Sequence, residues 1–367
     1  MVLKFQATKL HFFLQNEKKY LTLQKKILMV KTMNRLIIST LIAIVIFSSS
    51  CVSNSSGKLP IAVGNTGEVL FVMGDYLWRG ASGDSIRKYF SEPVWGLPNF
   101  EPMFSLTQNT VLTKFMQKFR NMVIINVDPG LEHSNFRIRT NVYANNQVVF
   151  NLDAPSADSI ISGIYKHKDL IIEYVLMKDR EAIIEDYVKT LAKPVIERVN
   201  EKFNVDIVIP RSYSLDVDRD NFMWIAREEG ERMWGILIWE EPYLRTSQLD
   251  TDSLIIRMNE KTKQHVPGPI DGSYMAVAPV IPPVVRRFEK NGVYSVQLNG
   301  MWHTENAFMA GPYVKQTIVD VNRGKLVTGL GFVFYPNREK RQMIRQLEAI
   351  LYTMMPTEDN PSVAELR

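Results

Sequence analysis

Short runs of alternating apolar and polar residues dominate the chain after residue 60 and predict β-strands. These runs are rich in Val, Ile, Phe, Tyr and Trp, which favour extended backbone. The predicted strands are 68–73, 122–127, 136–143, 147–152, 205–209, 221–227, 233–239, 293–302, 313–321 and 325–335. Asn145-Asn146 and Asn322-Arg323-Gly324 lie between consecutive runs and predict hairpin turns.

Apolar residues spaced three and four apart predict helices between the strands. The expected helices are 84–90 with Ser82 as a cap, 110–119, 156–203 with a restart at Pro194, 250–263, and a last one near 343–354. Three prolines make 93–102 an extended loop, and Pro267-Gly268-Pro269 ends the fourth helix. Segments 84–128 and 193–243 share a similar order of elements. The pattern therefore predicts an α+β fold with antiparallel sheets and segregated helices, in two similar α/β halves.

The region from Met33 to Cys51 has the pattern of a bacterial lipoprotein signal peptide. Arg35 is followed by twelve mostly apolar residues, too few for the ~20 of a membrane-spanning helix. Ser48, Ser49 and Ser50 then lead to Cys51, the single cysteine of the chain, which we expect to carry a lipid. An ordinary secretory signal or a short anchor is the alternative, and Ser48 replaces the Leu that is typical three residues before the cysteine.

The predicted processing divides the chain into five parts. Residues 1–32 are a mis-set start or a basic extension, 33–50 the signal, 51–58 a flexible tether, 59–355 the α+β domain, and 356–367 a polar tail. The full chain has 44 Lys and Arg against 39 Asp and Glu, a net charge of +5. Eight of those basic residues and one acidic residue precede Cys51, so the remainder is close to neutral, and nucleic-acid binding loses its support.

No motif for catalysis or metal binding stands out, and we expect no cofactor and no metal. His133, His167, His265 and His303 are far apart in sequence. The segment 216–220 resembles the start of a calcium loop, but Asn221 and Arg227 occupy the positions that need Gly and Glu, so we interpret it as a solvated turn. Glu228-Glu229 and Glu240-Glu241 are adjacent acids on strands, whose side chains should point to opposite faces.

The aromatic residues offer a more specific hypothesis. Trp224, Trp234 and Trp239 fall on adjacent strands, where packing into the core is the simpler interpretation. The alternative is a groove in which indoles bind a sugar or peptide. The residues predicted for such a binding rim are Trp302, His303, Tyr313, Pro267 and Trp95.

Ordered sequence pieces from Lys58 to Thr353 resemble a Bacteroidota lipoprotein family, domain of unknown function 4837. The pieces are 67–73, 97–104, 119–125, 203–210, 221–224, 266–268, 274–275, 309–313, 331–336 and 345–353. Ala310 departs from the family's usual Met-Gly-Gly-Pro. The resemblance implies a location in the cell envelope and brings no known reaction, substrate or catalytic residue.

These observations together predict an outer-membrane lipoprotein, lipidated at Cys51, that faces the periplasm. We expect a non-enzymatic module that binds an envelope protein or glycan, with the membrane contacted through the N-terminal lipid. An envelope hydrolase acting on glycan or peptidoglycan is the alternative, and it would need carboxylates gathered in one cleft.

Overall fold

The computed structural model describes residues 58–357. The predicted signal peptide, Cys51, most of the tether and the polar tail from residue 358 lie outside the described residues. Residues 59–357 belong to one compact unit. No helix within 58–357 is both long and apolar enough to cross a membrane.

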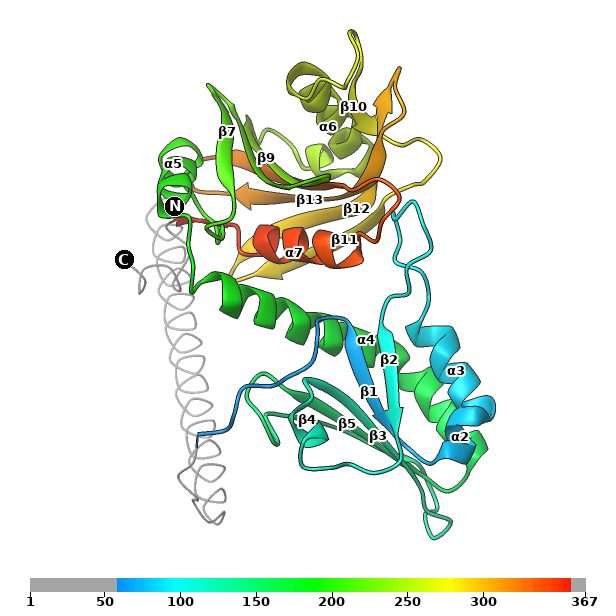
Figure 1. Ribbon diagram of the computed structural model, residues 1–367. Coiled ribbons are helices and arrows are strands. Elements are labelled where there is room, and N and C mark those ends of the chain that lie inside the picture. The colour runs from blue at the N-terminus through cyan, green and yellow to red at the C-terminus, as the bar shows by residue number, and fades with distance from the viewer. Residues whose placement is uncertain (1–57, 358–367) are drawn as a thin grey trace, which may run out of the picture. The chain divides into compact units, whose positions relative to one another are not determined.

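The first half of the described chain forms a five-stranded sheet (Figure 1). Its strands are β1 (Glu68–Val72), β2 (Ser105–Asn109), β3 (Asn121–Val127), β4 (Asn135–Thr140) and β5 (Val148–Ala154), in the order β2-β1-β3-β5-β4. The first three pairings are parallel, and only β4 runs antiparallel to its neighbour β5. This sheet therefore departs from the antiparallel arrangement that the short alternating runs suggested.

Helices cover one face of this sheet. They are α2 (Asp75–Arg79), α3 (Ala81–Phe90) and the long α4 (Ala157–Tyr187). Ile86, Phe90, Ile160 and Ile164 from the helices pack with Phe71 and other side chains of the sheet in one buried cluster. Gly163 allows α4 to lie against Leu152 of β5, because a Cβ at that position would press on the leucine side chain.

The second half of the chain forms an eight-stranded antiparallel sheet, as the sequence predicted (Figure 1). Its main order is β10-β12-β13-β14-β9-β8-β7, and β11 pairs with another part of β12. The strands are β7 (Ser214–Arg219), β8 (Phe222–Glu229), β9 (Arg232–Pro242), β10 (Tyr274–Val277), β11 (Val284–Lys290), β12 (Val293–Glu305), β13 (Ala310–Asp320) and β14 (Lys325–Phe334). A separate two-stranded ladder joins β6 (Val205–Asp206) to β15 (Met355–Pro356).

Both faces of the larger sheet are buried. The helix α6 (Thr251–His265) covers one face, where Leu254 and Met258 pack on the sheet. On the other face α5 (Lys193–Phe203) and α7 (Arg341–Tyr352) pack with side chains that alternate with the first set along each strand. One 3₁₀ turn, η2 (Thr246–Leu249), precedes α6. The α+β class is thus confirmed, with two halves that differ in strand direction.

Buried polar contacts join the two halves. The Asp179 carboxylate on α4 accepts hydrogen bonds from Gly67 N (2.5 Å) and Asn121 Nδ2 (3.0 Å). It also lies 3.8 Å from the guanidinium groups of Arg120 and of Arg345 on α7. Burial raises the pKa of Asp179 above its ordinary value, although the neighbouring donors and arginines oppose that rise. The carboxylate thereby connects α4, β3 and α7.

Several predicted elements were wrong or incomplete. Residues 110–119 are not an α-helix, and contain only the 3₁₀ turn η1 (Met116–Lys118). Ser82 lies inside α3, which begins at Ala81, and does not cap it. The segment 216–220, interpreted as a turn, falls mostly in β7. Residues 205–209 contain a strand of two residues, and α2, β2, β10 and β11 were not predicted.

Candidate functional site: an apolar pocket beside α6

An apolar pocket of about 260 Å³ opens on the α6 face of the larger sheet. Its floor consists of side chains from four strands, and its wall comes from β10, the loop 266–269 and the end of the β12–β13 hairpin. The lining residues are Trp224, Met233, Val266, Pro267, Gly268, Pro269, Met275, Trp302, Thr304, Met309, Phe332 and Phe334. The residues come from positions up to 110 apart in sequence, so strand pairing creates the pocket.

Three aromatic rings, those of Phe332, Trp224 and Trp302, form the floor of the pocket. The Phe332 ring lies 5.8 Å from the ring of Trp224 and 5.8 Å from that of Trp302, both in edge-to-face geometry. Gly235, opposite Phe332 in the β14–β9 register, leaves room for this ring, since a Cβ there would overlap it. Edge-to-face pairs add about 0.5–1.5 kcal/mol each beyond their buried area. The floor is therefore preorganised.

Trp302 is held in place by a hydrogen bond and by a glycine. Its indole N–H donates to the carbonyl of Val333 at 3.2 Å, and the side chain is 3% exposed. Gly311 faces Trp302 across the β12–β13 pairing, and a Cβ at Gly311 would overlap the same Val333 carbonyl. Trp302 thus forms a fixed wall of the pocket rather than an exposed stacking platform.

Three methionines, Met233, Met275 and Met309, complete much of the lining. Methionine side chains are unbranched and polarizable, so they adjust to ligands of different shape. They are combined here with a rigid aromatic floor. The pocket can therefore accept apolar groups of different shapes.

The polar features of the pocket are few. The indole Nε1 of Trp224 is buried and has no hydrogen-bond partner within residues 58–357. A buried donor without a partner costs roughly 1–3 kcal/mol. Because the Nε1 atom is buried, a ligand in the pocket does not reach it. The lining therefore suits an apolar group.

The loop that forms the rim is fixed to β10. Gly268 N donates to the Ser273 carbonyl at 2.8 Å, and Met275 N donates to the Val266 carbonyl at 3.1 Å. Exposed apolar side chains extend the rim outward: Ile270 in this loop is 57% exposed, and Phe308 at the β12–β13 turn is fully exposed. Apolar groups around a pocket mouth are typical of interaction surfaces.

The structure brings together two of the five residues predicted for a binding rim, Trp302 and Pro267. His303 projects from the opposite face of β12, with Nε2 3.2 Å from Glu305. Tyr313 is 1% exposed, and burial raises its pKa well above the ordinary value. Trp95 is 53% exposed, and its N–H donates to the Pro282 carbonyl at 2.9 Å. These three residues do not line the pocket.

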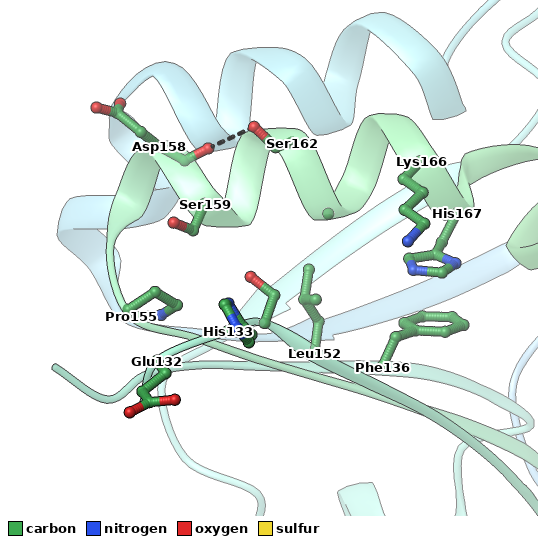
Figure 2. Close-up of a pocket in the computed structure, with 12 residues that line it drawn as sticks. Glu132, His133, Phe136, Leu152, Pro155, Asp158, Ser159, Ser162, Lys166 and His167 are labelled. Carbon is green, nitrogen blue, oxygen red and sulfur yellow. Dashed lines mark hydrogen bonds between the residues drawn. The ribbon is translucent and has the colours of Figure 1, made fainter. Parts of the chain in front are cut away.

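A second, polar cleft of about 410 Å³ lies beside the start of α4 (Figure 2). The loop after β3 supplies Glu132, His133 and Ser134, and α4 supplies Asp158, Ser159, Ser162, Lys166 and His167. Figure 2 shows Glu132 and Asp158 near one end of the cleft and Lys166 and His167 near the other. Sequence reasoning missed this cleft because its residues are ordinary surface types.

The histidines of the polar cleft are not joined to an acid or a nucleophile. His167 stacks on Phe136 at 4.0 Å, and burial together with Lys166 lowers its pKa. The Ser162 hydroxyl donates to the backbone carbonyl of Asp158 at 3.1 Å (Figure 2). Within residues 58–357, no group of three His, Cys, Asp or Glu side chains is arranged to hold a metal ion. We assign no reaction to this cleft.

The adjacent acids Glu240 and Glu241 both form ion pairs. Glu240 lies 3.0 Å from both Arg323 and Lys325, whereas Glu241 lies 3.0 Å from Arg257 on α6. The two carboxylates therefore serve different partners, as expected for neighbours on a strand. Neither glutamate lines the apolar pocket or the polar cleft.

Comparison with protein families gives two matches. Residues 193–353 match the family described as Domain of unknown function (DUF4837), and residues 62–188 match Domain of unknown function (DUF8532). The first match confirms the predicted resemblance for the second half of the chain, and it begins at residue 193 rather than at Lys58. No curated protein matches the chain.

Two solved structures share limited similarity with the chain. The Ran-binding protein Mog1p of Saccharomyces cerevisiae has 7% identity and a TM-score of 0.30, covering 42% of this chain and 90% of its own. LpqN of Mycobacterium tuberculosis, described as involved in cell envelope biogenesis, has 12% identity and a TM-score of 0.26, covering 41% and 83%. Scores this low carry no argument about function.

Proposed function

We propose that this protein is a membrane-anchored envelope lipoprotein whose second half binds a partner protein without catalysing a reaction. The apolar pocket beside α6 is the observation that carries the binding role. The sequence pattern ending at Cys51 supports lipidation, and the resemblance to a Bacteroidota lipoprotein family supports an outer-membrane location facing the periplasm.

The chemistry of the pocket favours a protein partner over a glycan. Sugar hydroxyls need several hydrogen-bond partners when they leave water. The pocket is lined mainly by aromatic and methionine side chains. An apolar anchor side chain of a partner protein would fit this surface. Such anchors in preformed pockets dominate the affinity of many protein interfaces.

The exposed rim supports the same role. Phe308 adjoins Met309, which lines the pocket, so a partner that inserts a side chain would also cover the Phe308 ring. Burying one exposed phenylalanine contributes about 1.5–3 kcal/mol. The pocket and its rim thus provide a continuous apolar contact. The hydrolase remains the alternative, and no described cluster of carboxylates favours it.

The test is co-purification after crosslinking in the native cell, with variants that change the pocket. Met309→Asp places a charge in the lining from a loop position, where the backbone tolerates it. Val280→Asp changes an apolar residue that is 78% exposed and does not line the pocket, so it is the matched control. We expect the wild type and Val280→Asp to recover the same stoichiometric partner, and Met309→Asp to lose it.

Membrane attachment is tested separately with Cys51→Ser. We expect this variant to leave the membrane fraction and still recover the partner from the soluble fraction. Intact-mass measurement of the wild type should show an acylated N-terminal cysteine. A chain that begins at Met1 without lipid would refute the location, and retention of the partner by Met309→Asp would refute the pocket's role.

A further inference from the structure

A third cleft, of about 510 Å³, lies along the middle of α4. One wall is formed by Asp169, Ile172, Glu173, Leu176, Met177 and Arg180 of α4, and the opposite side by Arg286 of β11 and Tyr352 at the end of α7. It is about twice the size of the apolar pocket and is lined by different residues. The proposed protein-binding role does not use it.

Two cations lie beside the ring of Tyr352 at one end of this cleft: Arg180, which lines the cleft, and Lys290, which is not among its lining residues. The guanidinium of Arg180 lies 4.1 Å from the ring centroid, and the Lys290 ammonium lies 4.7 Å from it. Lys290 also donates to the Tyr352 backbone carbonyl at 2.6 Å. Phe288 stacks on Tyr352 at 5.8 Å, which fixes the ring between its neighbours. Arg180 and Lys290 are therefore both held next to the Tyr352 ring.

These cations are poorly balanced by carboxylates. The nearest acid to Arg180 is Glu348 at 3.9 Å, and Glu348 also accepts a hydrogen bond from Gln297 at 3.0 Å. Lys290 has no carboxylate within ion-pair distance in the described part of the chain. Burial, and then the charge of Arg180, lower the pKa of Lys290 to about 8. An anion bound beside Arg180 and Lys290 would favour the charged amine and so offset the lowering of its pKa.

The wall next to this cationic end is apolar. Ile172 and Leu176 are one helical turn apart on α4, and Met177 extends the surface toward Arg180. Residues 169–180 span about 16 Å of helix. An extended apolar chain fits along such a wall while its charged head reaches Arg180. At the far end the exposed Glu173 lies 3.8 Å from Arg286 of the opposite wall, so that cation is paired with an acid. Asp169 adds a second exposed carboxylate there, which disfavours an anionic head group at that end.

We propose that this cleft binds an amphipathic anion, a carboxylate or phosphate that carries an apolar chain. The anionic head lies between Arg180 and Lys290, and the chain lies against Ile172, Leu176 and Met177. The same chemistry occurs in a free fatty acid and in a membrane lipid head group with its chain. The two sources are separated by the form in which the probe is offered.

The first experiment is calorimetric titration of the full protein with dodecanoate, with dodecyl phosphate, and with acetate and dodecanol as controls. We expect saturable binding of at least one of the two anionic amphiphiles. Acetate lacks the chain and dodecanol lacks the charge, so each should bind at least tenfold more weakly. Equal binding of dodecanol would show that charge is irrelevant and would overturn the proposal.

Substitutions locate the site. Lys290→Gln removes one cation while keeping a polar side chain, and should weaken binding of the anion about tenfold or more. Met177→Glu introduces repulsion at the apolar wall and should do the same. Lys166→Gln, on the same helix but in the polar cleft, should leave the affinity unchanged. Binding that is equally strong in Lys290→Gln and in the wild type would overturn the assignment.

A second readout distinguishes a site at Lys290 from a general loss of stability. The Lys290 pKa, followed by NMR of labelled lysine, should rise on saturation with dodecanoate, because the anion favours the charged amine. Vesicles of phosphatidylglycerol and of phosphatidylcholine complete the test. Lys290-dependent binding to the anionic vesicles alone identifies a membrane lipid, whereas binding of the free amphiphile alone identifies a soluble one. Failure of every anionic probe would overturn the inference and leave the proposed partner binding unaffected.

Discussion

The buried lysine of β13 gives a direct test of how the larger sheet is stabilised. Lys315 is 1% exposed and faces the α6 side, between Leu298 and Leu330 of the neighbouring strands. Its ammonium donates to the Leu254 carbonyl at 3.1 Å. Burial, with a smaller effect from Arg257, lowers the pKa of Lys315 to about 7. The charge is therefore unfavourable in the folded state.

We predict that Lys315→Met stabilises the protein below neutral pH. A fall in pKa from 10.5 to about 7 corresponds to about 5 kcal/mol of lost stability when the unfolded lysine is protonated. The variant loses the hydrogen bond to Leu254, which costs about 1 kcal/mol. Imperfect packing of the methionine costs up to about 1.5 kcal/mol. The expected net gain at pH 6 is about 2–4 kcal/mol.

The gain should shrink as the pH rises. Between about pH 7 and pH 10.5 the folded Lys315 has lost its proton while the unfolded lysine retains it. The unfolded state then binds more protons, so wild-type stability rises by about 1.4 kcal/mol per pH unit from this residue. Lys315→Met lacks this contribution. Its advantage should therefore nearly vanish by pH 9–10.

The assay is urea unfolding followed by tryptophan fluorescence at pH 6, 7, 8 and 9. Lys166→Met is the control, because Lys166 is exposed on α4 and its replacement should change stability by less than about 0.5 kcal/mol. A Lys315→Met variant less stable than the wild type at pH 6 would refute the reasoning. A stability difference that is constant with pH would refute it equally, since burial of the charge could not then be its source.

Three further substitutions test the framework around the sites. Asp179→Asn leaves the buried Arg345 without its counter-charge and should lower the unfolding free energy by about 3 kcal/mol, measured by urea denaturation. Glu101→Gln should cost about 1–2 kcal/mol in the same assay, because the carboxylate accepts hydrogen bonds at 2.7–3.0 Å from the amides of Lys340, the N-cap residue of α7, and Arg341, its first residue. Gly311→Ala should cost about 1–3 kcal/mol and change Trp302 fluorescence, since its Cβ overlaps the Val333 carbonyl; an unchanged spectrum would contradict this.

The strongly periodic parts of the fold could be predicted from sequence. The runs that became β9, β12, β13 and β14 carry apolar residues on both faces, and both faces are buried by helices. Helix α7 has one continuous apolar stripe and packs on the sheet as expected. In these segments local pattern and tertiary burial agree, which is why the class and the second half were recognised.

The failures occurred where tertiary packing overrode local spacing. Leu112, Met116 and Phe119 have helical spacing, yet they cover the outer face of the five-stranded sheet from an irregular segment. The spacing correctly indicated which side chains are buried, but the predicted helical backbone was wrong. The β7 strand is an edge strand with mostly exposed acids, so its Leu215 and Val217 gave too weak an alternation to outweigh the turn signal.

The pocket could be predicted only in part, because strand register determines its composition. Trp302 and Pro267 were singled out, but Met233 and Phe332 meet only through the pairing of β9 with β14. Phe332 and Phe334 are two residues apart and lie on the same face of β14, and this spacing could have added both to the predicted binding rim. The alternation also separates His303 from Trp302, although the two residues are adjacent in sequence.

The two proposed sites differ in how they relate to the two family matches. Every residue lining the apolar pocket lies between 224 and 334, within the 193–353 match. The cleft along α4 is instead lined by Arg180, within the 62–188 match, and by Tyr352, within the 193–353 match. The proposed partner site therefore needs residues of the second segment alone, whereas the proposed anion site needs residues of both segments, which the buried contacts of Asp179 join.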